Sequence, residues 1–200
     1  MKKVLYLLAL CSSMFASVAL ALPTVGQPAD DFTLTDTNGK ARKLSDYHGK
    51  VVVLEWFNHE CPFVKKHYNS GNMQSLQKAY TGRDVVWLSI NSTNSSHSDF
   101  HDAKVSNELT QSKHAAPTAV LLDPDGKVGK LYGAKTTPHM FVVDNKGALV
   151  YAGAIDDKRS TDPADVKTSK NYVAAALDET MAGKPVTTNT SVPYGCSVKY

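Results

Sequence analysis

The residue of this chain best suited to chemistry is Cys61, in the stretch EWFNHECPFVKKHY between an apolar run and a helix-like segment. Pro62 follows it and suits the first turn of a helix, so the sequence places Cys61 at a helix N-terminus. Unpaired backbone N–H groups and the positive end of the helix dipole stabilise a thiolate there, and the thiolate is the reactive form of cysteine. We therefore predict that Cys61 is a nucleophile.

The usual second cysteine of a redox pair is missing, because Val64 stands three residues after Cys61. The chain has three cysteines, Cys11, Cys61 and Cys196, and the last two lie 135 positions apart. Gly195 and the polar segment TTNTS before it would let a flexible tail fold back, so that Cys196 resolves oxidised Cys61. Alternatively the two cysteines form a permanent disulfide, which could stabilise the fold by about 4–5 kcal/mol in the chain-entropy model. The residues leave both roles of Cys196 open.

Three histidines, His59, His67 and His139, could surround Cys61 and suggest a second class of function, a copper chaperone with cysteine and histidine ligands. Histidines near a helix start more often serve hydrogen bonds or tune a pKa, so we predict no metal site. The chain carries no nucleotide or flavin motif, and we predict no cofactor. Electrons would then come from another thiol protein or a small thiol.

The N-terminus has the pattern of a secretory signal peptide. Two lysines precede the apolar run VLYLLALCSSMFASVALA, and the Ala-Leu-Ala of residues 19–21 marks a cleavage point before Leu22. A membrane anchor is the alternative, but Cys-Ser-Ser interrupts the run, which is marginal against the roughly 20 apolar residues of a span. We predict that residues 1–21 are removed and that the protein is exported to the bacterial periplasm, with no membrane contact after cleavage.

Length and charge limit the remaining choices. A chain of 200 residues with 42% hydrophobic content suits one domain with its own core. We place a folded domain at 22–185 and a tail carrying Cys196 at 186–200. The formal charge of +3 falls to +1 without the two lysines of the signal, which gives no electrostatic footprint for nucleic acid.

The elements that must position Cys61 alternate between strands and helices. The run KVVVLEWF before it has the continuous apolar pattern of a strand buried on both faces, and the later runs repeat the alternation. We expect strands at 50–57, 84–91 and 117–123, a broken helix at 62–80 and a weak helix at 100–113. This order predicts a mostly parallel sheet.

Antiparallel hairpins are expected on both sides of these elements. DFTLTDTNGKARKLSDY alternates apolar and polar residues around Asn-Gly and predicts an edge hairpin, and a second hairpin joins HMFVVD to ALVYAG. A helix is expected at 171–182, ended by glycine and proline. Trp56 and Trp87 should lie in the core, whereas the DDK of residues 156–158 looks like solvated surface.

This order of elements resembles the thioredoxin fold, and more narrowly the redoxin group that includes alkyl hydroperoxide reductase/thiol-specific antioxidant (AhpC/TSA) and TlpA-like proteins. The pieces that match are VGQPADDFTLTDTNGKARKLSDYHGKVVVLEW, Cys61-Pro62, PTAVLLDPDGKVGKLYGAKTTPHMFVVD and GALVYAGAID. An exported subgroup with NHxCPFVxKHY and a C-terminal PYGCSVKY is similar at both ends. The resemblance implies an α/β thioredoxin-like fold with an N-terminal β-hairpin and a central mixed sheet flanked by helices.

The resemblance also implies site residues. Pro138 after Thr137 would be a cis-proline beside the active cysteine, presenting a backbone edge to a substrate peptide. Peroxiredoxins usually carry a threonine three positions before the cysteine and an arginine before the strand that here begins at His139. This chain has Asn58 and Pro138 at those positions, which argues against a standard peroxidase.

The prediction from sequence is an exported thiol-based oxidoreductase with thiol-disulfide exchange or peroxide activity. Cys61 is the nucleophile, Cys196 the resolving partner, and Thr137 and Pro138 shape the substrate edge. Asn58 and His139 are the orienting residues. The substrate would be a peroxide or a protein disulfide; the alternatives are the copper chaperone and a non-catalytic redoxin that binds a partner through the cis-proline edge.

Overall fold

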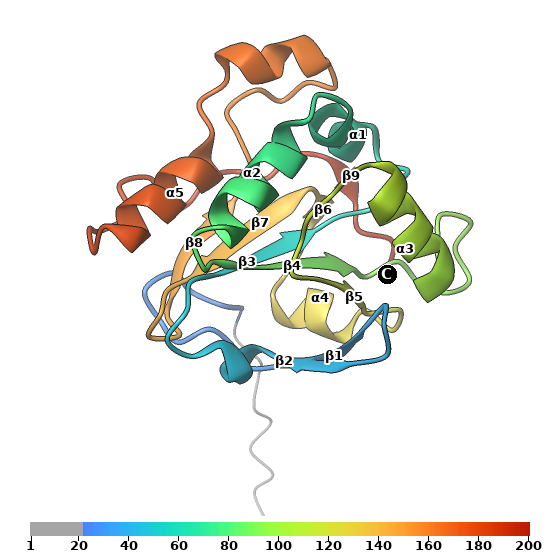
Figure 1. The fold of residues 1–200 in the computed structure, drawn as a ribbon, viewed down its shortest axis with the longest axis horizontal. Helices are drawn as coiled ribbons and strands as arrows, with labels where there is room; N and C mark the ends of the chain where they lie inside the picture. Colours follow the sequence, from blue (N-terminus) through green and yellow to red (C-terminus); the bar gives the residue numbers. More distant parts are fainter. Residues whose placement is uncertain (1–21) are drawn as a thin grey trace, which may run out of the picture.

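A seven-stranded mixed sheet forms the centre of the protein, in the order β2-β1-β5-β4-β3-β7-β8 (Figure 1). The computed structural model describes residues 22–200, so the predicted signal peptide lies outside the described residues. The strands are β1 Thr33–Asp36, β2 Ala41–Lys43, β3 Val52–Trp56, β4 Val86–Asn91, β5 Ala119–Leu122, β7 His139–Val143 and β8 Leu149–Gly153. No helix within 22–200 is long and apolar enough to cross a bilayer.

The three central strands follow the predicted alternation. β3, β4 and β5 are parallel neighbours, and every residue of β3 and β4 is buried because both faces of the sheet are covered. The hairpins β1–β2 and β7–β8 add antiparallel strands at the two sides, and β2 is an edge strand as predicted. The sheet is therefore mixed, with its parallel part confined to the centre, and the prediction of a mostly parallel sheet is wrong because four of its six strand pairs are antiparallel.

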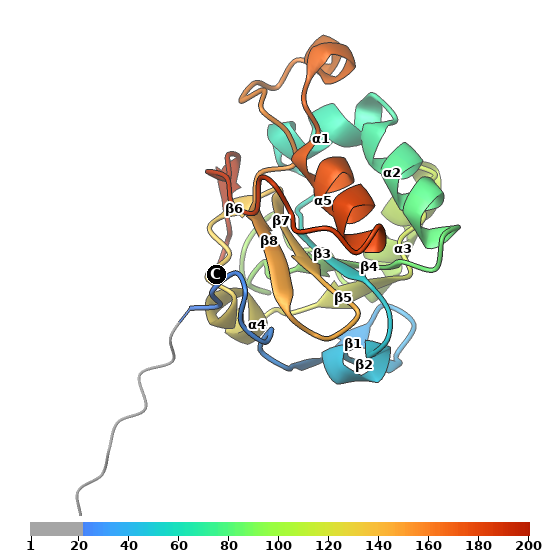
Figure 2. The same cartoon turned by 90° about the vertical axis from the view of Figure 1, so that its left-hand side faces the viewer.

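The helices cover both faces of this sheet. They are α1 Pro62–Asn69, α2 Asn72–Thr81, α3 Ala103–Ser112, α4 Lys127–Leu131 and α5 Tyr172–Met181, with 3-10 helices at Leu44–Tyr47 and Pro163–Thr168. α1, α2 and α5 pack with Trp87 on one face, whereas α4 and the N-terminal segment pack with Trp56 on the other (Figures 1 and 2). The predicted break is correct, since Gly71 has a φ of +77° between α1 and α2.

The short helix α4 was not expected, because the DPDG segment was interpreted only as a turn. The carboxylate of Asp123 is buried and accepts hydrogen bonds from Ser92 Oγ (2.6 Å) and the backbone N–H of Gly129 (2.8 Å). Asp123 thereby accepts hydrogen bonds from unpaired backbone N–H groups at the start of α4. This helix is too short to show a 3.6-residue apolar period, so the sequence pattern does not predict it.

The C-terminal tail does not form the free, flexible approach that its polar sequence suggested. β9, Cys196–Ser197, pairs antiparallel with β6, Thr136–Thr137, in a separate two-stranded sheet. Upstream, the backbone N–H of Ser191 donates to Ala152 O (3.2 Å), so the tail runs beside β8 (Figure 2). These backbone groups pair with the fold instead of with water, and the tail is held against it.

Candidate active site

Cys61 lies at the N-cap of α1, just after β3, as the sequence predicted. Asn58 shapes this connection: its backbone carbonyl accepts from Cys61 N (3.2 Å) and its side-chain Oδ1 accepts from Glu60 N (2.7 Å). Its Nδ2 donates to Thr93 Oγ1 (2.8 Å), and the Asn58 side chain is buried. Only 4% of the Cys61 surface is exposed.

The fold brings Cys61 and Cys196 together. Their Sγ atoms are 2.7 Å apart, and Cys61 Sγ also lies 2.9 Å from the carbonyl oxygen of Thr137. Cys196 is paired directly opposite Thr137 in the β6–β9 sheet, so its thiol meets Cys61 at the start of α1. Both cysteines are free thiols here, Cys61 buried and Cys196 only partly buried.

The two thiols differ in acidity. Burial raises the pKa of Cys61, but contacts with the Cys196 thiol, Thr137 and the backbone of Val64 and Cys196 outweigh it and lower this pKa below the ordinary value. Burial and the contact with Cys61 raise the pKa of Cys196 to about 11. In this pair Cys61 takes the thiolate role and Cys196 remains the protonated partner.

The Thr137–Pro138 peptide bond is cis, as the resemblance implied. The tail occupies the backbone edge before this proline, because Cys196 and Ser197 pair with Thr137 and Thr136. Gly195 is required for this approach: its φ is +147°, and a Cβ there would stand 2.0 Å from Thr137 O. The edge expected to receive a substrate peptide is thus filled by the chain itself.

A cavity of about 150 Å³ opens beside the two cysteines. Asn58, Thr93, Asp99 and Lys199 supply polar groups to its wall, and Cys61 and Cys196 both line it. It is smaller than the roughly 300–1,000 Å³ of typical pockets for drug-sized ligands. The cavity therefore suits molecules smaller than such ligands, and both thiols form part of its wall.

The three histidines lie in different surroundings. The ring of His59 packs on Phe57, and His139 packs on Phe141 and accepts from the backbone N–H of Lys135 (3.3 Å). We predicted that His139 orients the reaction at Cys61. Its ring instead contacts Phe141 and Lys135, and it makes no hydrogen bond to Cys61. Among residues 22–200 no group of three or more His, Cys, Asp or Glu side chains could hold a metal ion.

The third histidine, His67, lies in a fully buried cluster with Lys66, Asp156 and the tail residue Tyr194. Asp156 was predicted to be solvated surface, and this prediction is wrong, since only 1% of the residue is exposed. The acidic and basic neighbours of Asp156 in sequence suggested exposure, but its charged partners come from α1. Sequence reasoning also gave no role to Tyr194, although its place in PYGCSVKY was a signal.

A buried carboxyl group, Glu55, lies in the middle of β3 and was also missed. It accepts hydrogen bonds from Trp87 Nε1 (2.7 Å), Ser89 Oγ (2.8 Å) and Tyr68 OH (2.8 Å). Burial raises its pKa, although these hydrogen bonds lower it in part. A lone acid inside the apolar run KVVVLEWF was the signal for such a network.

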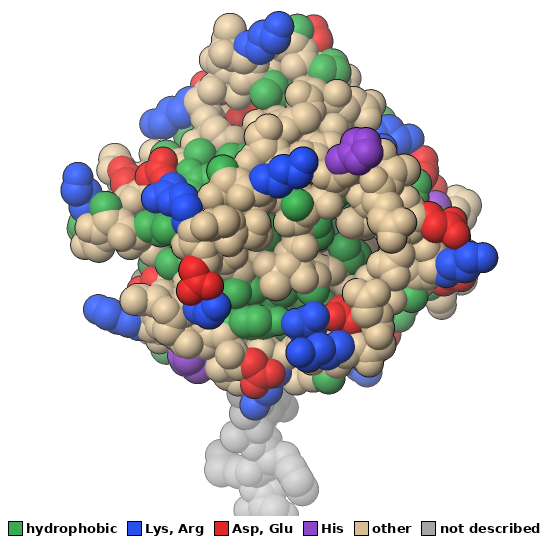
Figure 3. Space-filling view, viewed as in Figure 1, with side chains coloured by type: hydrophobic (Ala, Val, Ile, Leu, Met, Phe, Trp, Pro, Cys, Tyr) green, Lys and Arg blue, Asp and Glu red, His purple; other side chains and the backbone are tan. Residues whose placement is uncertain are grey.

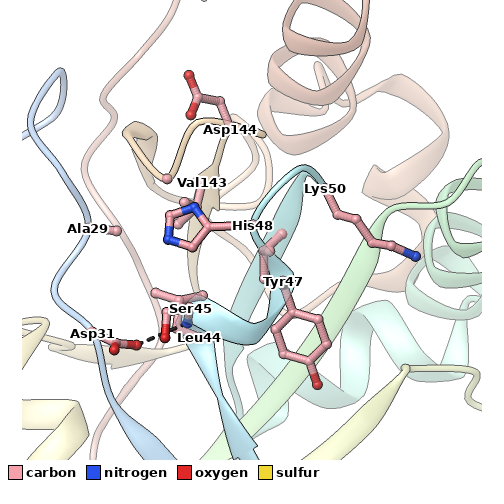
Figure 4. A pocket seen from close by; sticks show the side chains of 11 residues that line it. Ala29, Asp31, Leu44, Ser45, Tyr47, His48, Lys50, Val143 and Asp144 are labelled. Atoms are coloured by element: carbon pink, nitrogen blue, oxygen red, sulfur yellow. Dashed lines mark hydrogen bonds between the residues drawn. The ribbon is translucent and has the colours of Figure 1, made fainter.

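Another cavity, of about 60 Å³, lies at the opposite end of the sheet, beside the start of β3 and the end of β7 (Figure 4). Asp31 accepts a hydrogen bond from the backbone N–H of Ser45 there (3.0 Å), and His48 and Lys50 line the wall. No cysteine lines this cavity. On the face shown in Figure 3, basic and acidic side chains are scattered singly or in small groups.

The fold and the cysteine at the start of α1 define a redoxin with a thioredoxin-like α/β architecture. The AhpC/TSA family matches residues 25–152, more than half of the chain, and the protein belongs to this family. The α/β thioredoxin-like fold predicted from the sequence is confirmed.

The relatives include thiol-disulfide oxidoreductases. The chain is 28% identical over 126 residues to thiol-disulfide oxidoreductase ResA of Bacillus thuringiensis, covering 63% of this chain and 67% of that protein. The match thus covers about two thirds of the length of these relatives. For ResA of Bacillus subtilis it covers 64% of that protein.

Two solved structures extend the comparison. A hypothetical protein of Sinorhizobium meliloti has a TM-score of 0.74 at 26% identity, covering 88% of this chain and 94% of that one. The exposed lipoprotein thioredoxin of Streptococcus pneumoniae has a TM-score of 0.51 at 25% identity, covering 70% and 97%.

Proposed function

We propose that this protein is an exported thiol-disulfide oxidoreductase that works through Cys61 and Cys196. The observation that supports this most directly is the 2.7 Å contact between the two Sγ atoms, with the lower pKa on the Cys61 side. A nucleophile with a low pKa and a partner thiol in contact are the two parts of a dithiol centre.

Oxidation of the centre proceeds in two steps. The Cys61 thiolate attacks one sulfur of a substrate disulfide, forming a mixed disulfide and releasing the first substrate thiolate. Cys196 then attacks Cys61 Sγ, releases the second substrate thiolate and gives a Cys61–Cys196 disulfide. Two electrons pass to the substrate, and the two thiol protons go to the released sulfurs. With a hydroperoxide, Cys61 becomes a sulfenic acid, an alcohol or water leaves, and Cys196 expels water.

The difference in exposure indicates where electrons return. Cys196 is only partly buried, whereas Cys61 is enclosed. A reducing thiol therefore attacks Cys196 Sγ, and Cys61 leaves as the thiolate with the lower pKa, which is the faster leaving group. Protein thiols or a small thiol would supply these electrons.

The test begins with protein in which Cys11 is changed to serine, so that only Cys61 and Cys196 carry thiols. The reduced protein receives one equivalent of hydrogen peroxide or of hydroxyethyl disulfide, and alkylation with peptide mass mapping follows before and after dithiothreitol. We expect a reducible Cys61–Cys196 disulfide, and in Cys196→Ser an adduct trapped on Cys61. If Cys61 stays free, the catalytic proposal fails; if the bond forms but resists dithiothreitol, the proposal also fails and the permanent disulfide replaces it.

Export to the periplasm is part of the proposal. It is supported by the N-terminal apolar run and by the similarity to a lipoprotein described as exposed in Streptococcus pneumoniae. Expression with a C-terminal tag, followed by cell fractionation and mass measurement of the mature N-terminus, tests it. Cleavage before Leu22 supports the proposal, and an intact N-terminus in the cytoplasm contradicts it.

The two alternatives have less support. Copper binding lacks a third ligand near Cys61 among the described residues, and a partner that pairs with β6 must first displace β9.

A further inference from the structure

The buried cluster around Asp156 joins the helix that carries Cys61 to the tail that carries Cys196. Lys66 and His67 belong to α1, whose N-cap is Cys61, and Tyr194 stands two residues before Cys196. The hydroxyl of Tyr194 donates to Asp156 Oδ1. The site described above does not use these four residues, although they account for much of the KHY and PYGC motifs.

Hydrogen bonds connect Asn72, His67, Tyr194 and Asp156 in a row, and Asp156 Oδ2 is left with only the nearby charges. Asn72 Nδ2 donates to Nδ1 of His67 (2.9 Å), and burial lowers the pKa of His67 to about 4, so its ring is neutral. The proton of the neutral ring then resides on Nε2, which faces the Tyr194 hydroxyl at 3.4 Å. Tyr194 OH therefore accepts from His67 while it donates to Asp156.

The charges of the cluster are also paired around Tyr194. Lys66 Nζ lies 3.6 Å from Asp156 Oδ2 and donates to the carbonyl oxygen of Lys158 (2.7 Å). The same ammonium lies 5.6 Å from the centre of the Tyr194 ring, and Phe63 of α1 packs edge-on against that ring at 5.8 Å. A charged pair without solvent contact needs fixed geometry, and the Tyr194 side chain contacts both of its members, through its hydroxyl and through its ring.

We propose that Tyr194 is a positioning residue that holds Cys196 in register with Cys61 through its hydrogen bond to Asp156. The inference rests on the proposed dithiol function. Tyr194 and Cys196 are two residues apart on the tail. Tyr194 contacts Asp156 beside α1, and Cys196 contacts Cys61 at the start of α1. Fixing one end of this short tail segment leaves little freedom at the other, so the hydroxyl keeps the Cys196 thiol close to its target.

The test compares three variants in the Cys11→Ser protein. Tyr194→Phe removes the hydroxyl but keeps the ring against Phe63. Tyr132→Phe is the matched control, because it also removes a partly buried tyrosine hydrogen bond, to Asp30 O (2.6 Å), but in the core on the other face of the sheet from Tyr194. Asp156→Asn replaces the charged acceptor of Tyr194 with a neutral one, which weakens the same hydrogen bond, and it serves as the test should Tyr194→Phe fail to fold.

The measurement is the equilibrium between the Cys61–Cys196 disulfide and glutathione buffers, with the rate of Cys196 alkylation in a Cys61→Ser background as second readout. We expect Tyr194→Phe to lower the equilibrium constant for disulfide formation about tenfold, roughly 30 mV, and to speed Cys196 alkylation by a similar factor. Asp156→Asn should change both in the same direction by less. Tyr132→Phe should lower the melting temperature and leave both unchanged.

The outcomes separate this inference from the function on which it rests. If the parent protein forms no reducible Cys61–Cys196 disulfide, the proposed function has failed. If the parent forms this disulfide, the comparison with Tyr132→Phe decides. The inference is overturned, and Tyr194 has only a structural role, when Tyr194→Phe matches Tyr132→Phe in both readouts, or when Asp156→Asn does so in its place.

Discussion

Cys61 and Cys196 are chemically identical residues whose surroundings give their thiols opposite shifts in pKa. Cys61 gains hydrogen-bond contacts that stabilise its thiolate, and the largest of these comes from Cys196. Cys196 is destabilised as a thiolate by burial and by the neighbouring sulfur. The acidity of Cys61 therefore depends on a residue 135 positions away in sequence.

We predict that Cys196→Ala raises the pKa of Cys61 and that Cys196→Ser raises it less, because only serine keeps a hydroxyl that can donate to the thiolate. The measurement is the rate of iodoacetamide alkylation at Cys61 as a function of pH, followed by peptide mass. An equal pKa for Cys61 in the parent, alanine and serine proteins would show that the contact with Cys196 does not set its acidity.

At the scale of elements, the decisive feature is the short pairing of β6 with β9. Two residues on each strand bring the tail across the cis-proline edge, and Gly195 lets the backbones approach. Tyr200 secures the tail beyond Cys196, donating from its hydroxyl to Ala134 O (2.7 Å). The tail is thus held on both sides of the cysteine that it presents.

We expect Gly195→Ala to push the tail off β6, because its Cβ would overlap Thr137 O and the backbone φ is positive. Formation of the Cys61–Cys196 disulfide after one equivalent of oxidant should slow by about tenfold or more, given that misplacement by about 1 Å can cost a hundredfold in rate. The control is Gly183→Ala, which also has a positive φ, +68°, but no atom within 4 Å of the added Cβ. Equal rates in the two variants would refute the role of the close approach.

Across the whole molecule, three buried histidines are neutral in the folded state. Burial lowers the pKa of His59, His67 and His139 to about 4 each. Their unfolded pKa is about 6.5, so between these values the unfolded chain binds more protons than the folded one. This contribution to stability is complete above pH 6.5 and is lost as the pH falls towards 4.

We predict that the free energy of unfolding, measured by urea titration, falls between pH 6.5 and 4.5. The slope from each histidine is at most about 1.4 kcal/mol per pH unit. His139→Gln should reduce this slope, and His48→Gln, which changes an exposed histidine, should leave it unaltered. A stability that is flat across this range would contradict the neutral, buried state of the three rings.

The sequence by itself determined most of the elements and the place of Cys61 at the start of a helix. The apolar run of β3, Pro62 after the cysteine, and the Asn-Gly turn act through neighbouring residues, and local patterns are enough to predict them. For the same reason the edge hairpin, the broken helix and both core tryptophans were predicted correctly.

Only the tertiary structure decided which distant residues meet. Three contacts depend on how the sheet, α1 and the tail are assembled. Cys196 contacts Cys61, Asp156 is buried against α1, and His139 faces Phe141 instead of the thiol. Residue types and spacing carry no direction for side chains separated by a hundred positions, so such contacts follow from packing and not from local pattern.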